Sequence, residues 1–214
     1  MKKSDLGKKI YLGEGLTSKC YRLSDNKVYK KFKRKRDIIE LKKYRDFLEY
    51  KNDSVIFPYD FVYKRKFIGY IYDYSEGLTL SNCFKDINID DLIFALEKVE
   101  RDINYISKGK IFMYDVHDDN IIYGNKKLSI IDVDEYNIKD SLSISDALYS
   151  NNIQFKNLIN GLIISNIPKE LLERFIKYKD LYNLSSYNLY KLKEDINDIY
   201  KEKIKTINDI WKVI

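Results

Sequence analysis

Apolar and polar residues alternate in short runs over the first 75 residues, a pattern that predicts strands. The first three runs cover residues 8–16, 20–23 and 27–32. Turn-forming residues at 24–26 separate the last two runs, and the segment 54–74 returns to β-branched and aromatic residues around a polar turn at 64–66. We therefore expect a small β-rich region in which hairpins join the strands.

One stretch in this region has a helical period instead. Over residues 36–50, apolar side chains recur three or four positions apart, at Ile38, Leu41, Tyr44 and Leu48. Asp37 precedes them as a candidate N-cap, because a carboxylate can accept hydrogen bonds from the free N–H groups of a first helical turn. These positions predict one helix among the strands.

From about residue 76 the pattern becomes mainly helical. The spacing predicts helices over 90–109 with Gly109 as the C-cap, from Pro168 through 182, and over 192–214. The tetrapeptide Ile-Asn-Asp-Ile occurs twice in the last segment, eleven residues apart. We interpret this repeat as one apolar face within a single helix.

Two β segments interrupt the helices: a strand-like run at 111–115 and a hairpin over 120–132 that turns at Gly124–Asn125. The chain is therefore expected to have an α+β fold. Residues 1–75 form the β-rich part with one helix, and residues 76–214 form the mainly helical part.

Composition places the chain among globular proteins, with 44% hydrophobic and 14% aromatic residues. Cys20 and Cys83 are too few for a disulfide framework, which favours a reducing compartment. No signal-peptide pattern and no run near the ~20 apolar residues of a membrane span is present. A cytoplasmic protein that does not cross a membrane is expected.

The net charge of +6 concentrates in Lys-Lys-Phe-Lys-Arg-Lys-Arg at 30–36. This run fits either a site for nucleic acid or an acidic partner, or a solvated connection between strand and helix. We favour the connection, because aromatic residues are not interleaved with the basic ones in a nucleic-acid-binding pattern. A nucleic-acid partner is not expected.

The only histidine, His117, lies in the segment MYDVHDDNII at 113–122. Asp115 and Asn120 frame it as Asp-x-x-x-x-Asn, and a second acidic cluster, IIDVDEY, brings Asp132 soon afterwards. Turn chemistry explains isolated Asp and Asn residues, but not two apolar residues directly ahead of Asp132. Since Mg²⁺ prefers oxygen ligands, we predict that Asn120 and Asp132 bind Mg²⁺ and that Asp115 faces a hydroxyl group.

Candidates for phosphate binding lie upstream. Gly13 and Gly15 in LGEGLTSKCY could let backbone N–H groups approach phosphate oxygens, although Gly-x-Gly between two strands is more often just a tight turn. Alternation directs either Lys30 or Lys31 of the later strand towards whatever this loop covers.

An acidic partner for Lys30 is expected on the predicted helix. Glu40 is slightly favoured, although it could instead form a capping box with Asp37. Glu49, farther along the same helix, is the alternative partner.

Over roughly residues 10–135 these motifs resemble the protein-kinase-like superfamily. MYDVHDDN looks like its catalytic loop, LSIIDVDEY its metal-binding strand, LGEGLTSKCY its glycine loop and VYK its β3 lysine motif. IYDYSEGLTL is similar to its hinge, with Tyr72 at the gatekeeper position. The resemblance implies a two-lobed protein-kinase-like fold, with an N-lobe at 1–75 and a C-lobe at 76–214.

The resemblance also implies roles for individual residues in ATP binding. Lys30 would contact the α and β phosphates, and Ser18 stands at the place of the third glycine. Asp73 and Ser75 would offer backbone groups to adenine. Asp115 would orient or deprotonate the acceptor hydroxyl, and His117 would contact the transferred phosphate.

Departures from the family imply a minimal kinase without elaborate self-regulation. Met113–Tyr114 replaces His-Arg, and Val133–Asp134 replaces Phe-Gly. No Ala-Pro-Glu motif is present, so residues 137–152 are at most a shortened activation segment.

The expected activity is Mg·ATP-dependent transfer of the γ-phosphate to a hydroxyl acceptor, with protein Ser/Thr favoured. Alternatives are a small-molecule kinase of the aminoglycoside or choline type, as His117 suggests, and a nucleotide-binding pseudokinase that acts as an interaction module. A glycosyltransferase using Asp-Val-Asp at 132–134 is disfavoured by the hairpins at the N-terminus. A nucleic-acid-binding protein would leave Asp115, Asn120 and Asp132 unexplained.

Overall fold

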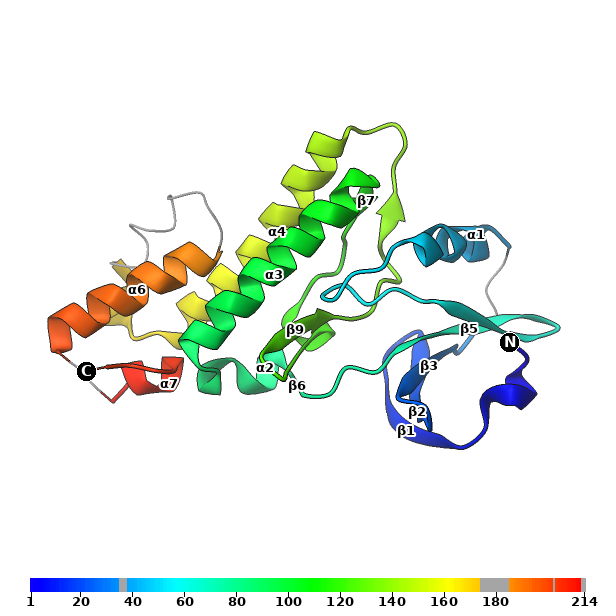
Figure 1. Cartoon of the computed structure of the whole chain (residues 1–214), viewed down its shortest axis with the longest axis horizontal. Helices are drawn as coiled ribbons and strands as arrows, with labels where there is room; N and C mark the ends of the chain where they lie inside the picture. The colour runs from blue at the N-terminus through cyan, green and yellow to red at the C-terminus, as the bar shows by residue number, and fades with distance from the viewer. Residues whose placement is uncertain (35–37, 174–184, 202, 213–214) are drawn as a thin grey trace. The chain divides into compact units, whose positions relative to one another are not determined.

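The computed structural model describes residues 1–34, 38–173, 185–201 and 203–212. The chain divides into two compact units, Met1–Ser75 and Glu76–Ile214, called the N-terminal and C-terminal units below (Figure 1). The fold is α+β: the first unit holds a five-stranded antiparallel sheet, and the second holds most of the helices. Among the described residues, no helix has both the length and the apolar character needed to cross a membrane.

The N-terminal sheet has the strand order β1-β2-β3-β5-β4. A 3-10 helix, η1 (Lys3–Leu6), precedes it, and the strands are β1 (Lys9–Glu14), β2 (Ser18–Leu23), β3 (Lys27–Phe32), β4 (Asp60–Lys64) and β5 (Lys66–Asp73). The strands predicted in 8–32 and the hairpin predicted around 64–66 are therefore confirmed. Residues 54–59, predicted to be β-type, are not in a strand of this sheet.

Side chains on the two faces of this sheet pack into separate layers, because neighbouring residues of a strand point to opposite faces. One face contributes Tyr29, Val62 and Ile71 to a core that also includes Leu6 of η1. The other face contributes Phe32 and other aromatic residues. The Phe32 ring lies 5.9 Å from the ring of Tyr44 on α1 (Ile38–Asp46).

The apolar face of α1 ends differently from the sequence prediction. Leu41, Tyr44 and Phe47 are buried, whereas Leu48 is only half-buried. The cause is that α1 tightens into the 3-10 helix η2 (Phe47–Glu49), whose three-residue period brings Phe47 onto the face. The predicted N-cap, Asp37, lies outside the described residues.

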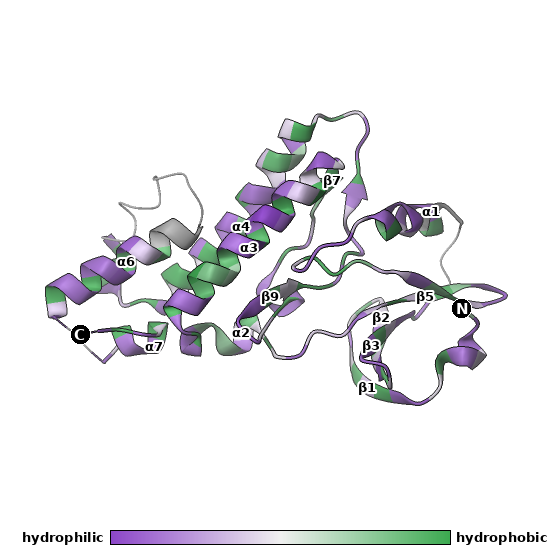
Figure 2. Cartoon of the chain, viewed as in Figure 1, coloured by the Kyte–Doolittle hydropathy of each residue, from purple (hydrophilic) through white to green (hydrophobic). Residues whose placement is uncertain are grey.

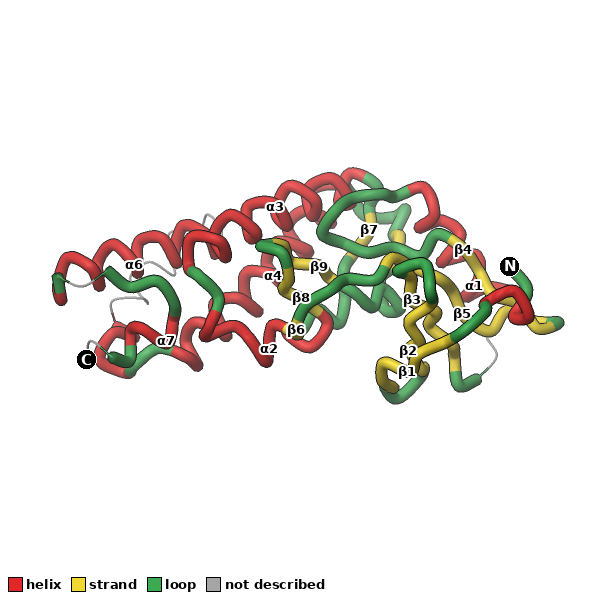
Figure 3. Tube along the Cα trace, turned by 60° about the horizontal axis from the view of Figure 1, so that its bottom comes forward, coloured by secondary structure: helices red, strands yellow, loops and turns green. Residues whose placement is uncertain are grey.

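The C-terminal unit is organised around α3 (Ile89–Lys108), which packs against α4 (Ile144–Asn166) and α6 (Ser185–Tyr200) (Figure 3). Apolar and polar residues alternate along α3 (Figure 2), whose buried side chains include Leu92, Leu96 and Ile103. Gly109 ends this helix as predicted, and its N–H donates to the carbonyl of Ile106 at 3.0 Å.

Short elements connect these helices. They are β6 (Leu78–Thr79), α2 (Leu80–Cys83), η3 (Phe84–Asp86), β7 (Ile111–Phe112), η4 (Asp118–Asn120), β8 (Ile121–Gly124), β9 (Lys127–Ile130), β10 (Asn137–Ile138) and α7 (Ile207–Ile210). The predicted strand at 111–115 is thus shorter, since only its first two residues form β7.

The predicted hairpin at 120–132 is present, but its turn lies one residue later than expected. Asn125 and Lys126 both have positive φ, at 50° and 60°, as a two-residue hairpin turn requires. Gly124 instead pairs with Lys127 in the ladder. Glycine is needed at this position because a Cβ would collide with the carbonyl oxygen of Glu76.

The single helix predicted over 192–214 is wrong. The helix α6 ends at Tyr200, and Lys201 follows with φ of 56°, a left-handed conformation that stops a helix. The two Ile-Asn-Asp-Ile repeats therefore lie in different helices, α6 and α7. Of the helix predicted from Pro168, residues 169–173 are helical, and 174–182 lie outside the described residues.

Replacing Thr206 with alanine is expected to lower the free energy of unfolding by about 1 kcal/mol. Thr206 Oγ1 accepts from the N–H of Asp209 at 3.2 Å, and the Asp209 carboxylate accepts from the Thr206 N–H at 3.0 Å. This capping box starts the short helix that buries Ile207 and Ile210. Urea unfolding of Thr206→Ala and of the matched Thr206→Ser measures the effect; equal losses in both variants would contradict a capping role.

Candidate functional site

Asn120, at the end of the loop that follows β7, links the segments of the three residues predicted to act on a metal ion and a hydroxyl group. The Asn120 side-chain Nδ2 donates to the backbone carbonyl of Asp115 at 3.2 Å. The Asn120 carbonyl accepts from the N–H of Ile131 at 2.8 Å, directly before Asp132. Asn120 therefore joins the segment of Asp115 to the segment of Asp132 within the C-terminal unit.

Asp115 and Asp132 share an uncommon backbone conformation, with φ of 58° and 64°. The other non-glycine residues with positive φ in the described chain lie in hairpin turns or next to helix ends: Asn26, Arg65, Lys110, Asn125, Lys126 and Lys201. Aspartate tolerates this conformation better than most residues, yet it carries a cost of about 1–3 kcal/mol. Such strain concentrates at active sites, where the surrounding structure holds it.

The negative charges of Asp115 and Asp132 both affect the pKa of one buried tyrosine, Tyr136. Tyr136 is fully buried, and burial is the main reason that its pKa is raised. The negative charges of Asp132 and, to a smaller extent, Asp115 raise the pKa of Tyr136 further. The two carboxylates therefore act on one region of the C-terminal unit.

His117 lies beside Asp115 and is not a core residue. Its side chain is 43% exposed, and its Nε2 lies 3.9 Å from Oδ2 of Asp115. Ligand atoms of His117, Asp118 and Asp119 all lie within 4.8 Å of one another, a spacing that would suit a metal ion. Sequence reasoning did not single out Asp118 and Asp119, although they adjoin the predicted site. Asp119 Oδ1 accepts from the hydroxyl of Ser81 at 2.6 Å.

Two amide side chains of α4 hold the backbone that leads to Asp115. The Met113 N–H donates to Oδ1 of Asn151 at 2.7 Å, and Asn151 Nδ2 donates to the Ile111 carbonyl at 2.7 Å. Gln154 Nε2 donates to the Met113 carbonyl at 2.6 Å. Both polar groups of Met113, two residues before Asp115, are thus fixed by one helix.

Sequence reasoning missed this contact, since residues 137–152 were interpreted as at most a shortened activation segment. The interpretation is wrong for its second half, because α4 already begins at Ile144. Ser143 caps the helix by accepting from the N–H of Asp146 at 3.1 Å. The available signal was an amide residue, Asn151, at helical spacing from the apolar Ala147 and Phe155.

In the N-terminal unit, Lys30 is the inward-facing lysine of the pair weighed from the sequence. It is only 2% exposed, and its Nζ lies 5.9 Å from the centre of the Tyr70 ring. The strand register places Gly13, Cys20, Lys30 and Tyr70 in one row across four strands. Gly13 and Lys30 therefore share one face of the sheet.

Nothing inside the described chain requires glycine at Gly13 or Gly15. Neither residue has positive φ, and a Cβ at either position would meet no atom within 4 Å. The Gly15 N–H donates to the carbonyl of Ser18 at 3.0 Å and closes the loop between β1 and β2. Ser18 itself is buried at the start of β2.

The other predicted residues of this unit lie on α1 and η2 and around the end of β5. The backbone of Glu40 lies in α1, but its side chain falls outside what the structure describes, so its pairing with Lys30 stays a prediction. Glu49 is exposed, which does not suit a partner for a buried lysine. Asp73 ends β5, and Ser75 is the last residue of the unit.

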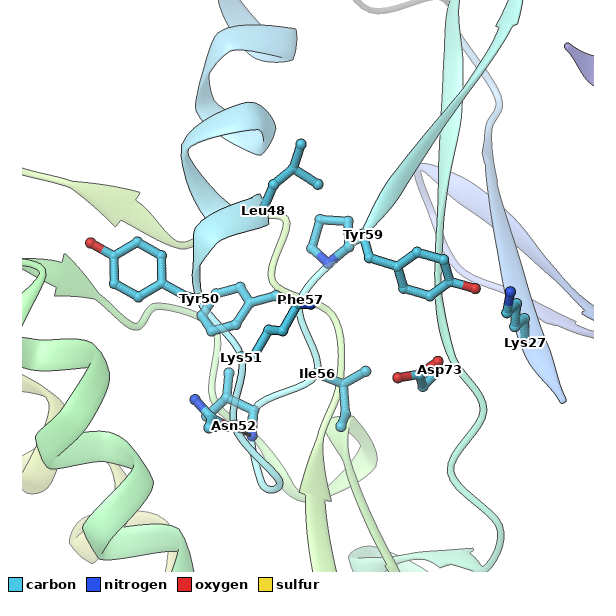
Figure 4. Close-up of a pocket in the computed structure, with 11 residues that line it drawn as sticks. Lys27, Leu48, Tyr50, Lys51, Asn52, Ile56, Phe57, Tyr59 and Asp73 are labelled. Carbon is cyan, nitrogen blue, oxygen red and sulfur yellow. Dashed lines mark hydrogen bonds between the residues drawn. The ribbon is translucent and has the colours of Figure 1, made fainter. Parts of the chain in front are cut away.

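The N-terminal unit also contains a cavity of about 580 Å³, within the size range of small-molecule sites (Figure 4). Its wall combines polar and apolar surface, with Tyr50, Phe57 and Tyr59 beside Lys27 and Asp73. The Tyr59 hydroxyl points towards Lys27. The hydrogen bond between these two side chains is the main cause of the raised pKa of Lys27. Of the predicted site residues only Asp73 lines this cavity.

No protein-family model matches the sequence, and the comparison with curated proteins gives no significant match. Function is therefore inferred from the residues and their geometry alone. Asp115, Asn120 and Asp132 are brought together in one unit, and Gly13 shares a sheet face with Lys30 in the other.

Proposed function

We propose that the protein is a Mg·ATP-dependent phosphotransferase of the protein-kinase-like superfamily, which transfers the γ-phosphate to a hydroxyl acceptor. The observation that carries the proposal is the link from Asn120 to the segments of Asp115 and Asp132. Asp115 and Asp132 both have left-handed backbone conformations, although neither lies in a hairpin turn or at a helix end. A solvated acidic loop has no need for this combination.

The donor set fits magnesium. Because Nδ2 of Asn120 donates to the Asp115 carbonyl, the amide orientation is fixed and its Oδ1 is left as a possible ligand. The Asp132 carboxylate would supply the second protein oxygen. Bound Mg²⁺ would neutralise charge that develops on the transferred phosphate.

Asp115 would orient the acceptor hydroxyl and accept its proton. His117, whose Nε2 lies 3.9 Å from the Asp115 carboxylate, would contact the transferred phosphate. Lys30 would contact the α and β phosphates of ATP. Lys30 shares a sheet face with Gly13 of the proposed phosphate loop, which suits this role.

The two-lobed arrangement belongs to the same proposal. The N-terminal unit would be the N-lobe, with Gly13 and Gly15 in a loop over the phosphates. Glycines that the fold itself does not require are consistent with a loop whose backbone approaches a ligand. Asp73 and Ser75 would present backbone groups to adenine.

A protein Ser/Thr residue is the favoured acceptor. The exposed His117 next to Asp115 favours a second candidate, a small-molecule kinase of the aminoglycoside or choline type. A pseudokinase that binds nucleotide without turnover is the non-catalytic alternative. Measuring ATP turnover separately from ATP binding distinguishes the pseudokinase from both kinases.

Mg·ATP is expected to stabilise the protein against thermal unfolding, by about 2.7 kcal/mol at roughly 100 times the dissociation constant. Asp132→Asn should lose the magnesium-dependent part of this stabilisation, because the amide is a weaker metal ligand than the carboxylate. Asp140→Asn, which changes an exposed carboxylate in the same unit, serves as the control and should behave as wild type. A wild-type protein whose unfolding does not respond to Mg·ATP would refute the proposal.

A further inference from the structure

The positive charge of the protein belongs to its N-terminal unit. Residues 1–75 hold 20 of the 39 lysine and arginine residues but only 10 of the 33 aspartate and glutamate residues. The C-terminal unit has more acidic than basic residues. A surface with such an excess of one sign attracts ligands of the opposite sign.

Much of this charge gathers at one end of the N-terminal sheet. The strand registers place the end of β3, the turn between β4 and β5 and the loop between β1 and β2 at the same end. We call the cations there the basic end, which consists of Lys31, Arg34, Lys64, Arg65 and Lys66. None of these five has an acidic partner among the described residues.

The fold places these charges where they repel one another. Lys64 pairs with Lys66 across the turn of the β4–β5 hairpin, and Lys31 pairs with Lys19 of β2. Like charges directly opposite each other destabilise a sheet. Arg65, the one residue between β4 and β5, has φ of 63°, a conformation that glycine or asparagine would adopt more easily. Glu14 pairs with Lys19, whereas Lys64, Arg65 and Lys66 have no acidic partner among the described residues.

The carboxylate of Glu14 is already bound by two lysines in this part of the sheet. Glu14 lies between Lys19, at 2.7 Å, and Lys33, at 3.6 Å, next to the basic end. The hydrogen bond from Lys19 is the main reason that the pKa of Glu14 is lowered. Leu16, in the adjacent loop, is 97% exposed.

We propose that the basic end binds an acidic segment of a partner polypeptide, a function that does not depend on phosphotransferase activity. Carboxylates of the segment would pair with the five cations, as Glu14 pairs with Lys19 and Lys33. An apolar side chain of the segment would cover Leu16, for which a phosphate backbone offers no counterpart.

The aromatic residues of the unit argue in the same direction. Its exposed aromatic side chains are Tyr11, in the middle of β1, and Tyr59, at the opposite end of the sheet. No exposed aromatic residue among those described lies at the basic end, so stacking with unpaired bases has no platform there. A polypeptide is therefore the better fit.

The test uses the full chain and a short fluorescein-labelled peptide of glutamates interrupted by leucines, with fluorescence anisotropy as the readout. Combining Lys64→Gln, Arg65→Asn and Lys66→Gln should weaken peptide binding about tenfold, since exposed ion pairs contribute up to about 1 kcal/mol each. The matched control combines Lys42→Gln, Arg45→Gln and Lys51→Gln, which remove the same charge from exposed positions on and after α1. Circular dichroism verifies that both variants fold.

Support requires that the control variant binds within about twofold of wild type and that binding weakens as salt increases. Equal loss in both triple variants would overturn the proposal, because net charge alone would then explain binding. Tighter binding of a thymidine oligonucleotide of equal charge, or of anionic vesicles, would also overturn it. So would the absence of peptide binding at low salt. None of these readouts involves ATP.

Discussion

Replacing Asp115 with asparagine is expected to lower the rate of ATP turnover by about 10²–10⁴-fold while leaving Mg·ATP affinity nearly unchanged. Asparagine keeps the size of the side chain and tolerates the φ of 58° found at Asp115, so the loop should keep its conformation. What it loses is the ability to accept a proton from the hydroxyl group. Steady-state turnover and a separate binding titration measure the two quantities.

Asp132→Asn gives the complementary pattern, with Mg·ATP affinity and turnover falling together, and Asp140→Asn should change neither. Observing these three patterns would separate the proton acceptor from the metal ligand. If Asp115→Asn weakened Mg·ATP binding as much as Asp132→Asn does, Asp115 would be a metal ligand. If it left turnover unchanged, the proposed role of Asp115 would be wrong.

The β-rich part could be predicted well because its signals are local. Alternation along β1, β2 and β3 and turn residues between them determine both strands and hairpins over short distances. Alternation also predicted that one of Lys30 and Lys31 faces inward, and the structure shows that Lys30 is the buried one. The cavity beside Tyr59 was not predicted, because its walls come from segments separated in sequence, such as Lys27 and Phe57.

Helix ends were harder to predict, because they depend on capping and packing more than on periodicity. The apolar period continues through Ile196 and Ile207, yet the backbone of Lys201 turns left-handed and Thr206 starts a new helix. Both isoleucines are buried, so each helix satisfies the periodic pattern separately. Periodicity alone cannot distinguish one long helix from two short ones that bury the same residues.

The candidate site also combines a part that local sequence spacing predicts with a part that depends on distant contacts. Asp115, Asn120 and Asp132 lie close together in sequence, so spacing was enough to propose that they meet. Asn151 contacts this segment from 38 and 40 residues away, at Met113 and Ile111. Its helical spacing from Ala147 and Phe155 indicates a buried amide but does not identify these partners. Support for a loop from a distant helix becomes visible only in the folded chain.

Asn151→Ala is expected to lower the free energy of unfolding by about 3–5 kcal/mol, the largest stability effect predicted for this chain. Asn151 is completely buried, and its amide satisfies three groups: the Met113 N–H, the Ile111 carbonyl and the Ser107 hydroxyl oxygen, at 2.7, 2.7 and 2.9 Å. Truncation leaves each of them without this partner where water does not reach. Each buried group left unsatisfied costs about 1–3 kcal/mol.

Denaturant unfolding compares this variant with Asn157→Ala, which changes the same residue type at an exposed position of α4. The control should remain within about 0.5 kcal/mol of wild type. A loss below about 1 kcal/mol in Asn151→Ala would mean that the three groups find other partners.

Hydrogen exchange measures the effect of Asn151→Ala at individual backbone amides. The amide of Met113 should lose protection in Asn151→Ala, because its acceptor is gone, whereas buried amides in the middle of α3 should keep most of theirs. Since Met113 is two residues from Asp115, ATP turnover should also fall at temperatures where the variant is still folded. Retained turnover despite lost Met113 protection would show that the catalytic loop does not depend on α4 for its conformation.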